Sequence, residues 1–432
     1  MSESQINWTD RLQVASFSDV GMRRATNQDN FSVSLANSVE HYQRKGHLFI
    51  VADGMGAHAA GELASKLAID HIPHLYNKYF NSSAPEELRK AVNDANAEIH
   101  RRGQANEEFY NMGTTCSVLT LLPQGAVVAH IGDSRVYRLT QNRLEQLTFD
   151  HSLVWEMKAA GQLTAEEEKS GKIPKNVITR SLGPYSECKV DLEGPFPIQV
   201  GDTFLLCSDG LTGVISDAEI AAILANMVPD EAVQVLVDLA NLRGGPDNIT
   251  VIIVKVNHPQ LATDGSLRPT RTNATAANRV IAPYWWVVLA AATAFAAFFL
   301  YADLGWQITL LPAVVAIASG IYIAVRLIMA SNVDERVVEN RRLGKGPYIR
   351  IGCPPGLQFS KQLADTLRQL QKGAVDQNWR VDWEQWKSMI TIAETAVKAK
   401  DYASSIRAYG RAICFLMDQL RNQAANSSSI DL

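Results

Sequence analysis

The sequence has no surplus of basic residues. Its 432 residues include 41 lysines and arginines against 45 aspartates and glutamates, which gives a formal net charge of -4 at pH 7. Proteins that bind DNA or RNA need clustered basic side chains to neutralise the phosphate backbone. We therefore expect that no nucleic acid is a partner of this protein.

Cysteine is scarce and is not arranged in pairs. The five cysteines are odd in number and scattered, and no two of them form a C-x-x-C motif. This pattern suggests neither a disulfide framework nor a zinc site, and it predicts small core residues in a reducing compartment. The first thirty residues also lack the basic start and apolar middle of a secretory signal. We expect the part of the chain that precedes the apolar segments described next to stay in the cytosol.

Two long segments of the chain are almost free of charge. They cover residues 284–302 and 307–330, and each is close to the roughly 20 apolar residues that a helix needs to span a bilayer. The turn between them carries only Asp303, and basic residues flank the pair. These are Arg268, Arg271, Arg279, Arg336, Arg341, Arg342 and Lys345. Because positive charge prefers the cytoplasm, we predict two transmembrane helices that form a hairpin in the inner membrane. The alternative is a buried helical pair inside a soluble domain.

The remaining sequence divides into a large first domain, a linker and a tail. Residues 12–256 alternate short Val/Ile/Leu runs with helical patterns, which predicts a mixed α and β domain. Runs such as C-S-V-L-T-L-L and I-T-V-I-I-V-K-V indicate buried strands, but their spacing does not say whether they form one sheet or two. Residues 257–282 form a polar linker. In the tail, residues 345–424, amphipathic helices are predicted at 358–372, 383–399 and 402–421.

The tail is predicted to lie in the cytoplasm, as is the large domain. Its last two helices faintly resemble one tetratricopeptide-type hairpin, which is too little for a solenoid. We expect a small helical bundle or a module that docks a protein partner.

Four aspartates in the large domain lie at the ends of predicted strands. Asp53 ends L-F-I-V-A-D-G, Asp133 ends A-V-V-A-H-I-G-D, Asp209 follows F-L-L-C-S, and Asp247 immediately precedes another strand. One such aspartate is usually a turn residue. Four of them gathered together would repel one another unless a cation compensates, and oxygen ligands favour Mg²⁺ or Mn²⁺ over zinc. The lack of a β-carbon at Gly54 would let its carbonyl oxygen join the ligands.

Eight motifs in this order resemble the metal-dependent serine/threonine protein phosphatases of type 2C, the PPM family, in a bacterial and membrane-anchored form. The motifs are S-D-V-G-M-R-R-A-T-N-Q-D (18–29), V-A-D-G-M-G-A-H-A-A-G-E (51–62), M-G-T-T (112–115), I-G-D-S-R-V-Y (131–137), L-T-F-D-H-S (147–152), T-R-S-L-G (179–183), C-S-D-G-L (207–211) and G-G-P-D-N-I-T (244–250).

This resemblance implies an α+β fold. The first domain would be a four-layer α/β/β/α sandwich with two central antiparallel sheets, followed by the transmembrane hairpin and the small α-helical tail. The metal ligands that the resemblance implies are Asp29, Asp53, Gly54, Asp133, Asp209 and Asp247. Asp53 would bridge two Mn²⁺ or Mg²⁺ ions, and Asp133 with Asp209 would hold a third, weaker ion.

The resemblance also implies a reaction. Two ions would activate a bridging water that hydrolyses phosphoserine or phosphothreonine directly. Arg24 would grip the phosphate oxygens, and His58 would protonate the departing alkoxide. Thr114, Thr115 and His151 are predicted to have structural roles. The substrates would be phosphorylated cytosolic proteins, and the enzyme would oppose serine/threonine kinases.

Two other functions stay open at this level. In the first, the protein is a pseudophosphatase, a membrane-anchored signalling scaffold with vestigial metal binding. In the second, it is a metal hydrolase that acts on small phosphate esters. The presence of every expected ligand argues against the scaffold.

Overall fold

The structure, a computed structural model, describes residues 8–57, 59–164, 167, 173–174, 177–263, 283–302, 314–322, 343–353 and 356–428. The chain divides into two compact units. The larger unit combines Met1–Arg268 with Arg342–Leu432, and the smaller unit is Pro269–Arg341. The chain therefore leaves the larger unit and returns to it.

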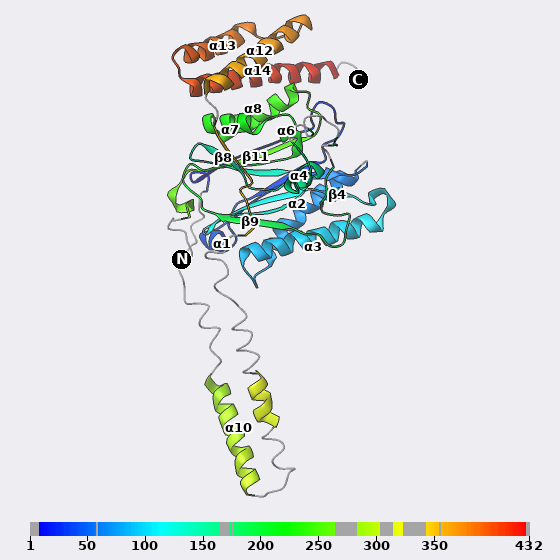
Figure 1. The fold of residues 1–432 in the computed structure, drawn as a ribbon, viewed down its shortest axis with the longest axis vertical. Coiled ribbons are helices and arrows are strands. Elements are labelled where there is room, and N and C mark those ends of the chain that lie inside the picture. The colour runs from blue at the N-terminus through cyan, green and yellow to red at the C-terminus, as the bar shows by residue number, and fades with distance from the viewer. Residues whose placement is uncertain are drawn as a thin grey trace. The chain divides into compact units, whose positions relative to one another are not determined.

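Two antiparallel sheets form the centre of the larger unit (Figure 1). Sheet A has the strand order β1 (Leu12–Asp19), β11 (Ile249–Val256), β10 (Thr203–Cys207), β7 (Arg135–Thr140), β8 (Arg143–Gln146) and β12 (Ile349–Gly352). Sheet B has the order β2 (Asp29–Ser34), β3 (His47–Met55), β5 (Cys116–Leu122), β6 (Gly125–Ile131) and β9 (Asp191–Phe196), and β4 (Gly113–Thr114) pairs with β3.

Helices cover both outer faces of the sheet pair. On the side of sheet B lie α1 (Val39–Lys45), α2 (Ala60–Lys78), α3 (Ala84–Ala105) and the short η1 (Glu107–Phe109). On the side of sheet A lie α6 (Asp209–Thr212), α7 (Asp217–Asn226) and α8 (Pro229–Leu242), while α4 (Leu153–Ala159) and η2 (Pro259–Leu261) belong to connections. The predicted α/β/β/α sandwich with two antiparallel sheets is confirmed.

Strand β3 shows why these strands appear in the sequence as continuous runs of apolar residues. Successive side chains of a strand point to opposite faces, and both faces of β3 are covered. Leu48 and Ile50 pack against α2 and α3, whereas Phe49 and Val51 pack against the inner face of sheet A. All of these side chains are buried, so no polar alternation marks the strand in the sequence.

The tail is part of the larger unit. Strand β12 pairs with β8 at the edge of sheet A, and Glu193 on β9 accepts hydrogen bonds from the Gly346 amide at 2.8 Å and the Tyr348 hydroxyl at 2.5 Å. Three helices follow, at the positions that the sequence predicts for them, and they lie over α7 and α8 (Figure 1). They are α12 (Gly356–Asp376), α13 (Trp383–Lys398) and α14 (Tyr402–Ser428).

Helix α8 is covered on both sides, by sheet A and by α14. Its sequence, P-D-E-A-V-Q-V-L-V-D-L-A-N-L, leaves few positions exposed, and even Asp238 and Asn241 are buried. A helix that is apolar on all sides has to be buried on all sides. One apolar cluster accordingly joins sheet A, α7, α8 and the tail helices.

In the smaller unit, residues 283–302 and 314–322 are described, and α10 spans Pro283–Tyr301. Among the described residues, no helix combines the length and the apolar character that crossing a membrane requires. Most of the polar linker and of the second apolar segment lies outside the described residues.

A substitution at Gly410 tests how closely the tail packs on α7 and α8. A β-carbon there would lie 2.6 Å from Cε of Met227 and 3.0 Å from Cγ2 of Val235, so a large side chain at this position would push against the end of α7 and against α8. Gly410→Leu should lower the free energy of unfolding of the full chain by about 1–3 kcal/mol in urea titrations.

Gly373→Leu in α12 is the matched control, because a β-carbon there meets nothing within 4 Å. Leucine also favours a helix over glycine by roughly 1 kcal/mol, so this variant should be as stable as the wild type or more stable. Equal stability of the two variants would show that the tail does not pack closely on the rest of the larger unit.

Candidate metal centre

The strand ends bring five aspartates to one end of the sandwich. Asp29 and Asp53 face each other directly across the β2–β3 pair. Asp209 begins α6, immediately after β10. Asp133 lies in the turn between β6 and β7, and Asp247 lies in the turn before β11. The neighbouring strands β2 and β3 of sheet B and the neighbouring strands β11, β10 and β7 of sheet A thus contribute, which explains why residues so distant in sequence meet.

The electrostatics of Asp53 show that the five carboxyl groups share one site. Burial raises the pKa of Asp53 well above its usual value, and the charges of Asp29, Asp209, Asp133 and Asp247 raise it further. Burial and the charge of Asp247 likewise raise the pKa of Asp209. Like charges have this effect only at short range, so these groups repel one another in the ion-free protein.

Three of the five carboxyl groups are incompletely hydrogen-bonded among the described residues. Burial raises the pKa of Asp29 to about 7, and also that of Asp133 to about 7. One carboxylate oxygen each of Asp29, Asp133 and Asp209 is buried without a hydrogen-bond partner among the described residues. Buried anionic oxygens in such an arrangement fit a hard divalent cation such as Mg²⁺ or Mn²⁺.

The five aspartates are close together, but the described residues do not form a complete metal-binding group. No group of three or more His, Cys, Asp or Glu side chains in the described ranges is arranged to hold a metal ion directly. One cause is visible at Asp247, whose Oδ2 accepts a hydrogen bond from Nη2 of Arg24 at 2.8 Å. A cation would have to compete with this arginine for the carboxylate.

Two threonines hold the backbone of Asp53. The amide of Thr115 and the hydroxyl of Thr114 both donate to the carbonyl oxygen of Asp53, each at 2.9 Å. The amide of Asp53 donates to Oγ1 of Thr115 at 2.9 Å. Both threonines therefore have the structural role predicted for them, and they fix the direction in which the Asp53 side chain leaves β3.

The packing around position 54 requires a glycine, for a reason that the sequence alone does not show. A β-carbon at Gly54 would lie 2.2 Å from the carbonyl oxygen of Gly61 and 2.6 Å from that of Gln28. The glycine thus allows the start of α2 to cross β3 closely. Its carbonyl as a metal ligand stays a prediction.

Sequence reasoning missed two residues of the site, although both lie in the motifs quoted above. Ser208 donates from its hydroxyl to Oδ2 of Asp29 at 2.7 Å. Asn248 accepts from the amide of Gln28 at 2.8 Å and donates to the carbonyl oxygens of Val20 and Thr26 at 2.9 and 3.0 Å. Asn248 therefore ties the turn of Asp247 to the loop that carries Arg24. Its position directly after Asp247 was the available signal.

The two candidate histidines differ. His58 lies outside the described residues. His151 is fully buried, accepts from the amide of Gly132 at 3.0 Å through Nδ1, and donates through Nε2 to Asp191 at 2.9 Å. Both ring nitrogens are thus used in holding the turn before Asp133, which is a structural role.

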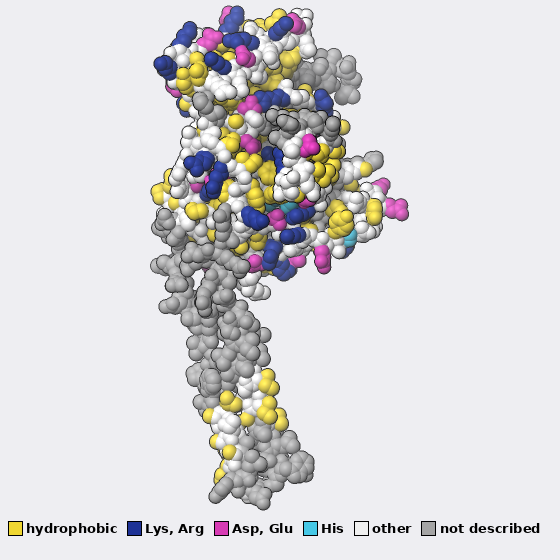
Figure 2. Space-filling view, in the orientation of Figure 1, with side chains coloured by type: hydrophobic (Ala, Val, Ile, Leu, Met, Phe, Trp, Pro, Cys, Tyr) yellow, Lys and Arg dark blue, Asp and Glu magenta, His cyan; other side chains and the backbone are white. Residues whose placement is uncertain are grey.

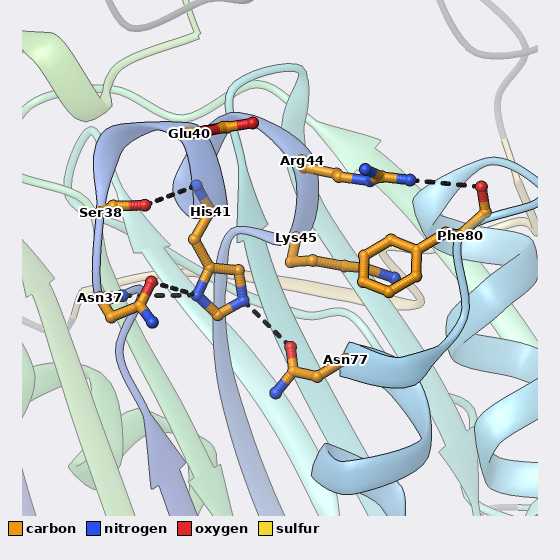
Figure 3. A pocket seen from close by; sticks show the side chains of 8 residues that line it. All are labelled: Asn37, Ser38, Glu40, His41, Arg44, Lys45, Asn77 and Phe80. Carbon is orange, nitrogen blue, oxygen red and sulfur yellow. Dashed lines mark hydrogen bonds between the residues drawn. The ribbon is translucent and has the colours of Figure 1, made fainter.

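The surface around these elements is mixed in charge. Lysine and arginine side chains are interspersed with aspartates and glutamates on the face of the larger unit that Figure 2 shows. A separate pocket lies at the C-terminal end of α2, where Asn77 and Phe80 line it (Figure 3). Asp53, by contrast, lies on β3, shortly before α2 begins. In the pocket, His41 bonds Asn37 and Asn77, each at 3.0 Å.

The family model for protein phosphatase 2C matches residues 23–237. A putative protein phosphatase 2C-type of Streptococcus pyogenes is 40% identical over 248 residues, which cover 56% of this chain and 97% of the relative. This chain belongs to the protein phosphatase 2C family.

Other relatives agree with this assignment. Serine/threonine phosphatase stp of Listeria innocua is 36% identical over 253 residues, covering 57% of this chain and 97% of the relative. The crystal structure of the Mycobacterium tuberculosis serine/threonine phosphatase PstP/Ppp is similar, with a TM-score of 0.51 and 35% identity over 57% of this chain and 100% of that one. The predicted enzyme class, a metal-dependent serine/threonine phosphatase, is confirmed.

The raised pKa of Asp133 can be tested by measuring thermal stability at two pH values. In the unfolded chain this carboxyl group ionises near its ordinary value of 3.8, whereas in the folded protein it ionises near 7. The ion-free folded state therefore loses stability as pH rises through this window. Asp133→Asn should raise the melting temperature in EDTA, with a larger effect at pH 7.5 than at pH 5.

Using the difference between the variant and the wild type removes contributions from buried histidines, which are common to both. One pKa unit corresponds to about 1.4 kcal/mol, and we expect at least this increase between the two pH values. Adding Mn²⁺ at pH 7.5 should shrink the difference or reverse it. A pH-independent difference would mean that Asp133 is not held in a repulsive acidic cluster.

Proposed function

We propose that this phosphatase hydrolyses phosphoserine and phosphothreonine on cytosolic proteins at the five-carboxylate site, and so opposes serine/threonine kinases. The observation that supports this most is the mutual repulsion of Asp53 with four other buried or half-buried carboxylates. The named relatives are serine/threonine phosphatases. A site that destabilises its own anions in this way favours divalent cations.

Asp53, Asp209 and Asp247 would hold the first ion, and Asp29 would act near the second. Asp133 with Asp209 would hold a third, weaker ion. When bound, two Mn²⁺ or Mg²⁺ ions supply an activated water and polarise the phosphoryl group. The serine or threonine Oγ–P bond breaks as the bond from water oxygen to phosphorus forms, and inorganic phosphate leaves.

The chain's own residues bind and orient the substrate. Arg24 is half exposed, with 51% of its side chain accessible, and faces the acidic site through Asp247. Its planar guanidinium can exchange that carboxylate for two phosphate oxygens. The departing alkoxide needs a proton, and we assign that role to His58.

Asp209→Asn in the full chain tests the site. Loss of a ligand should cost several kcal/mol of transition-state stabilisation, which is more than about 100-fold in the Mn²⁺-dependent hydrolysis of a phosphothreonine peptide. Asp70→Asn in α2, an exposed carboxylate, is the control and should keep wild-type activity.

Three other outcomes would contradict the proposal. A wild-type protein that binds Mn²⁺ but does not hydrolyse the peptide would favour the signalling scaffold. Faster hydrolysis of nucleotides or sugar phosphates than of phosphopeptides would favour an esterase of small molecules. Unchanged activity of Asp209→Asn would place the reaction elsewhere.

We further propose that residues 284–302 and 307–330 anchor the enzyme in the inner membrane as a hairpin, with the catalytic domain and the tail in the cytoplasm. The flanking basic residues support this orientation. The packing of the tail supports an even number of crossings, because β12 pairs with β8 of the catalytic domain. Both parts must then lie on the same side of any membrane.

Cell fractionation tests the anchor. The full chain should stay in the membrane fraction after a carbonate wash at high pH, and a variant in which a short Gly/Ser linker replaces residues 283–330 should be released. Release of the full chain by the same wash would contradict the hairpin. Phosphopeptide hydrolysis by both forms would show that the catalytic unit is intact in each.

A further inference from the structure

Arg421 on α14 connects the tail to the loop that carries Arg24. Its Nη2 donates to Oδ1 of Asp238 on α8 at 2.5 Å and lies 3.9 Å from Oδ2 of Asp19. Asp238 is 1% exposed and Asp19 is the last residue of β1. The side chain of one tail residue thus faces a buried carboxylate and the end of β1, an edge strand of sheet A.

Asp238 makes this contact strong. Its carboxyl group is buried, and an uncompensated buried charge is costly. Arg421 supplies the compensating charge, and removing one partner of such a pair leaves the other unpaired. The guanidinium is therefore held in place where it also faces Asp19.

Asp19 in turn organises the start of the loop at residues 20–28. Its Oδ1 accepts hydrogen bonds from the amide of Gly21 at 2.8 Å and from Nδ2 of Asn241 at 3.1 Å. Gly21 has a φ of 78°, and a β-carbon there would lie 2.2 Å from the carbonyl oxygen of Asp247. The loop therefore crosses the backbone of Asp247 at a distance that only glycine permits.

The same loop is tied to the turn of Asp247 at further points. The amide of Met22 donates to the carbonyl oxygen of Gly245 at 2.9 Å. Asn248 bonds the loop at three backbone groups, as described above, and Arg24 bonds Asp247 itself. A displacement of Asp19 would therefore move Arg24 and Asp247 together.

We propose that Arg421 is a positioning residue for the phosphatase, which acts through Asp19 to hold the Arg24 loop and the Asp247 turn in their binding geometry. The proposal rests on the phosphate-binding role proposed above for Arg24. The relatives cover 56–57% of this chain, and the family match ends at residue 237. The tail thus supplies, from outside the matched region, a contact to the strand end that leads into the Arg24 loop.

Arg421→Gln in the full chain is the test. Because the loop would be less well ordered before the substrate binds, KM for a phosphothreonine peptide should rise about three- to tenfold, while kcat changes less than twofold. Arg421→Lys, which keeps the charge but not the fork, should restore part of the difference. Asp19→Asn should raise KM similarly, and the double variant should show less than the product of the two effects.

Arg411→Gln is the matched control. Arg411 lies on the same helix and bonds Glu231 of α8 at 2.5 Å, so its loss removes a tail contact of the same kind without touching Asp19. Melting temperatures of all variants are measured first, and kinetics are recorded well below them.

The results distinguish failure of this proposal from failure of the proposed function. If Arg421→Gln lowers the melting temperature but leaves KM equal to that of Arg411→Gln, Arg421 only fastens the tail and the proposal is wrong. Additive effects of Arg421→Gln and Asp19→Asn would also overturn it. A wild-type chain without Mn²⁺-dependent hydrolysis would instead overturn the proposed function.

Discussion

Repulsion between carboxylates is the constraint on which the rest of this structure depends. Asp53 lies at the end of a strand whose two faces are both buried, and four other aspartates raise its pKa from neighbouring strand ends. In water such charges would separate, but here the backbone prevents it, because the β2–β3 ladder and the two threonines fix Asp53 in position. The fold thus spends stability on an arrangement that only protons, Arg24 or cations can relieve.

The packing of the tail is also linked to the candidate site. Helix α8 is apolar on the side that faces sheet A and on the side that faces α14. The catalytic part therefore needs a cover, and the tail provides it with β12 and three helices. In this contact Arg421 pairs with the buried carboxylate of Asp238. The pair lies close to Asp19, at the strand end that leads into the Arg24 loop. The tail, which the sequence predicts as a separate helical module, therefore forms a further layer of the enzyme.

Much of this could be predicted from the sequence, for identifiable reasons. The strands ending near Asp53, Asp133 and Asp209 are apolar runs followed by an aspartate, and the structure places them as expected. The division into two sheets could not be read, because strands buried on both faces have no alternation. The pairing of β12 could not be read either, since I-R-I-G is too short to show which edge it joins. The role of Asn248 depends on three backbone groups of a distant loop, which no local pattern contains.

The central claim is that the five aspartates converge because divalent cations belong between them. Diffraction from crystals of the Mn²⁺-loaded protein, recorded at the manganese absorption edge, tests it most directly. The account predicts anomalous peaks in contact with carboxylate oxygens of Asp53, Asp209 and Asp247, with Arg24 displaced from Asp247. Crystals grown in excess Mn²⁺ that show no peak at this site, with Arg24 still bonded to Asp247, would contradict it.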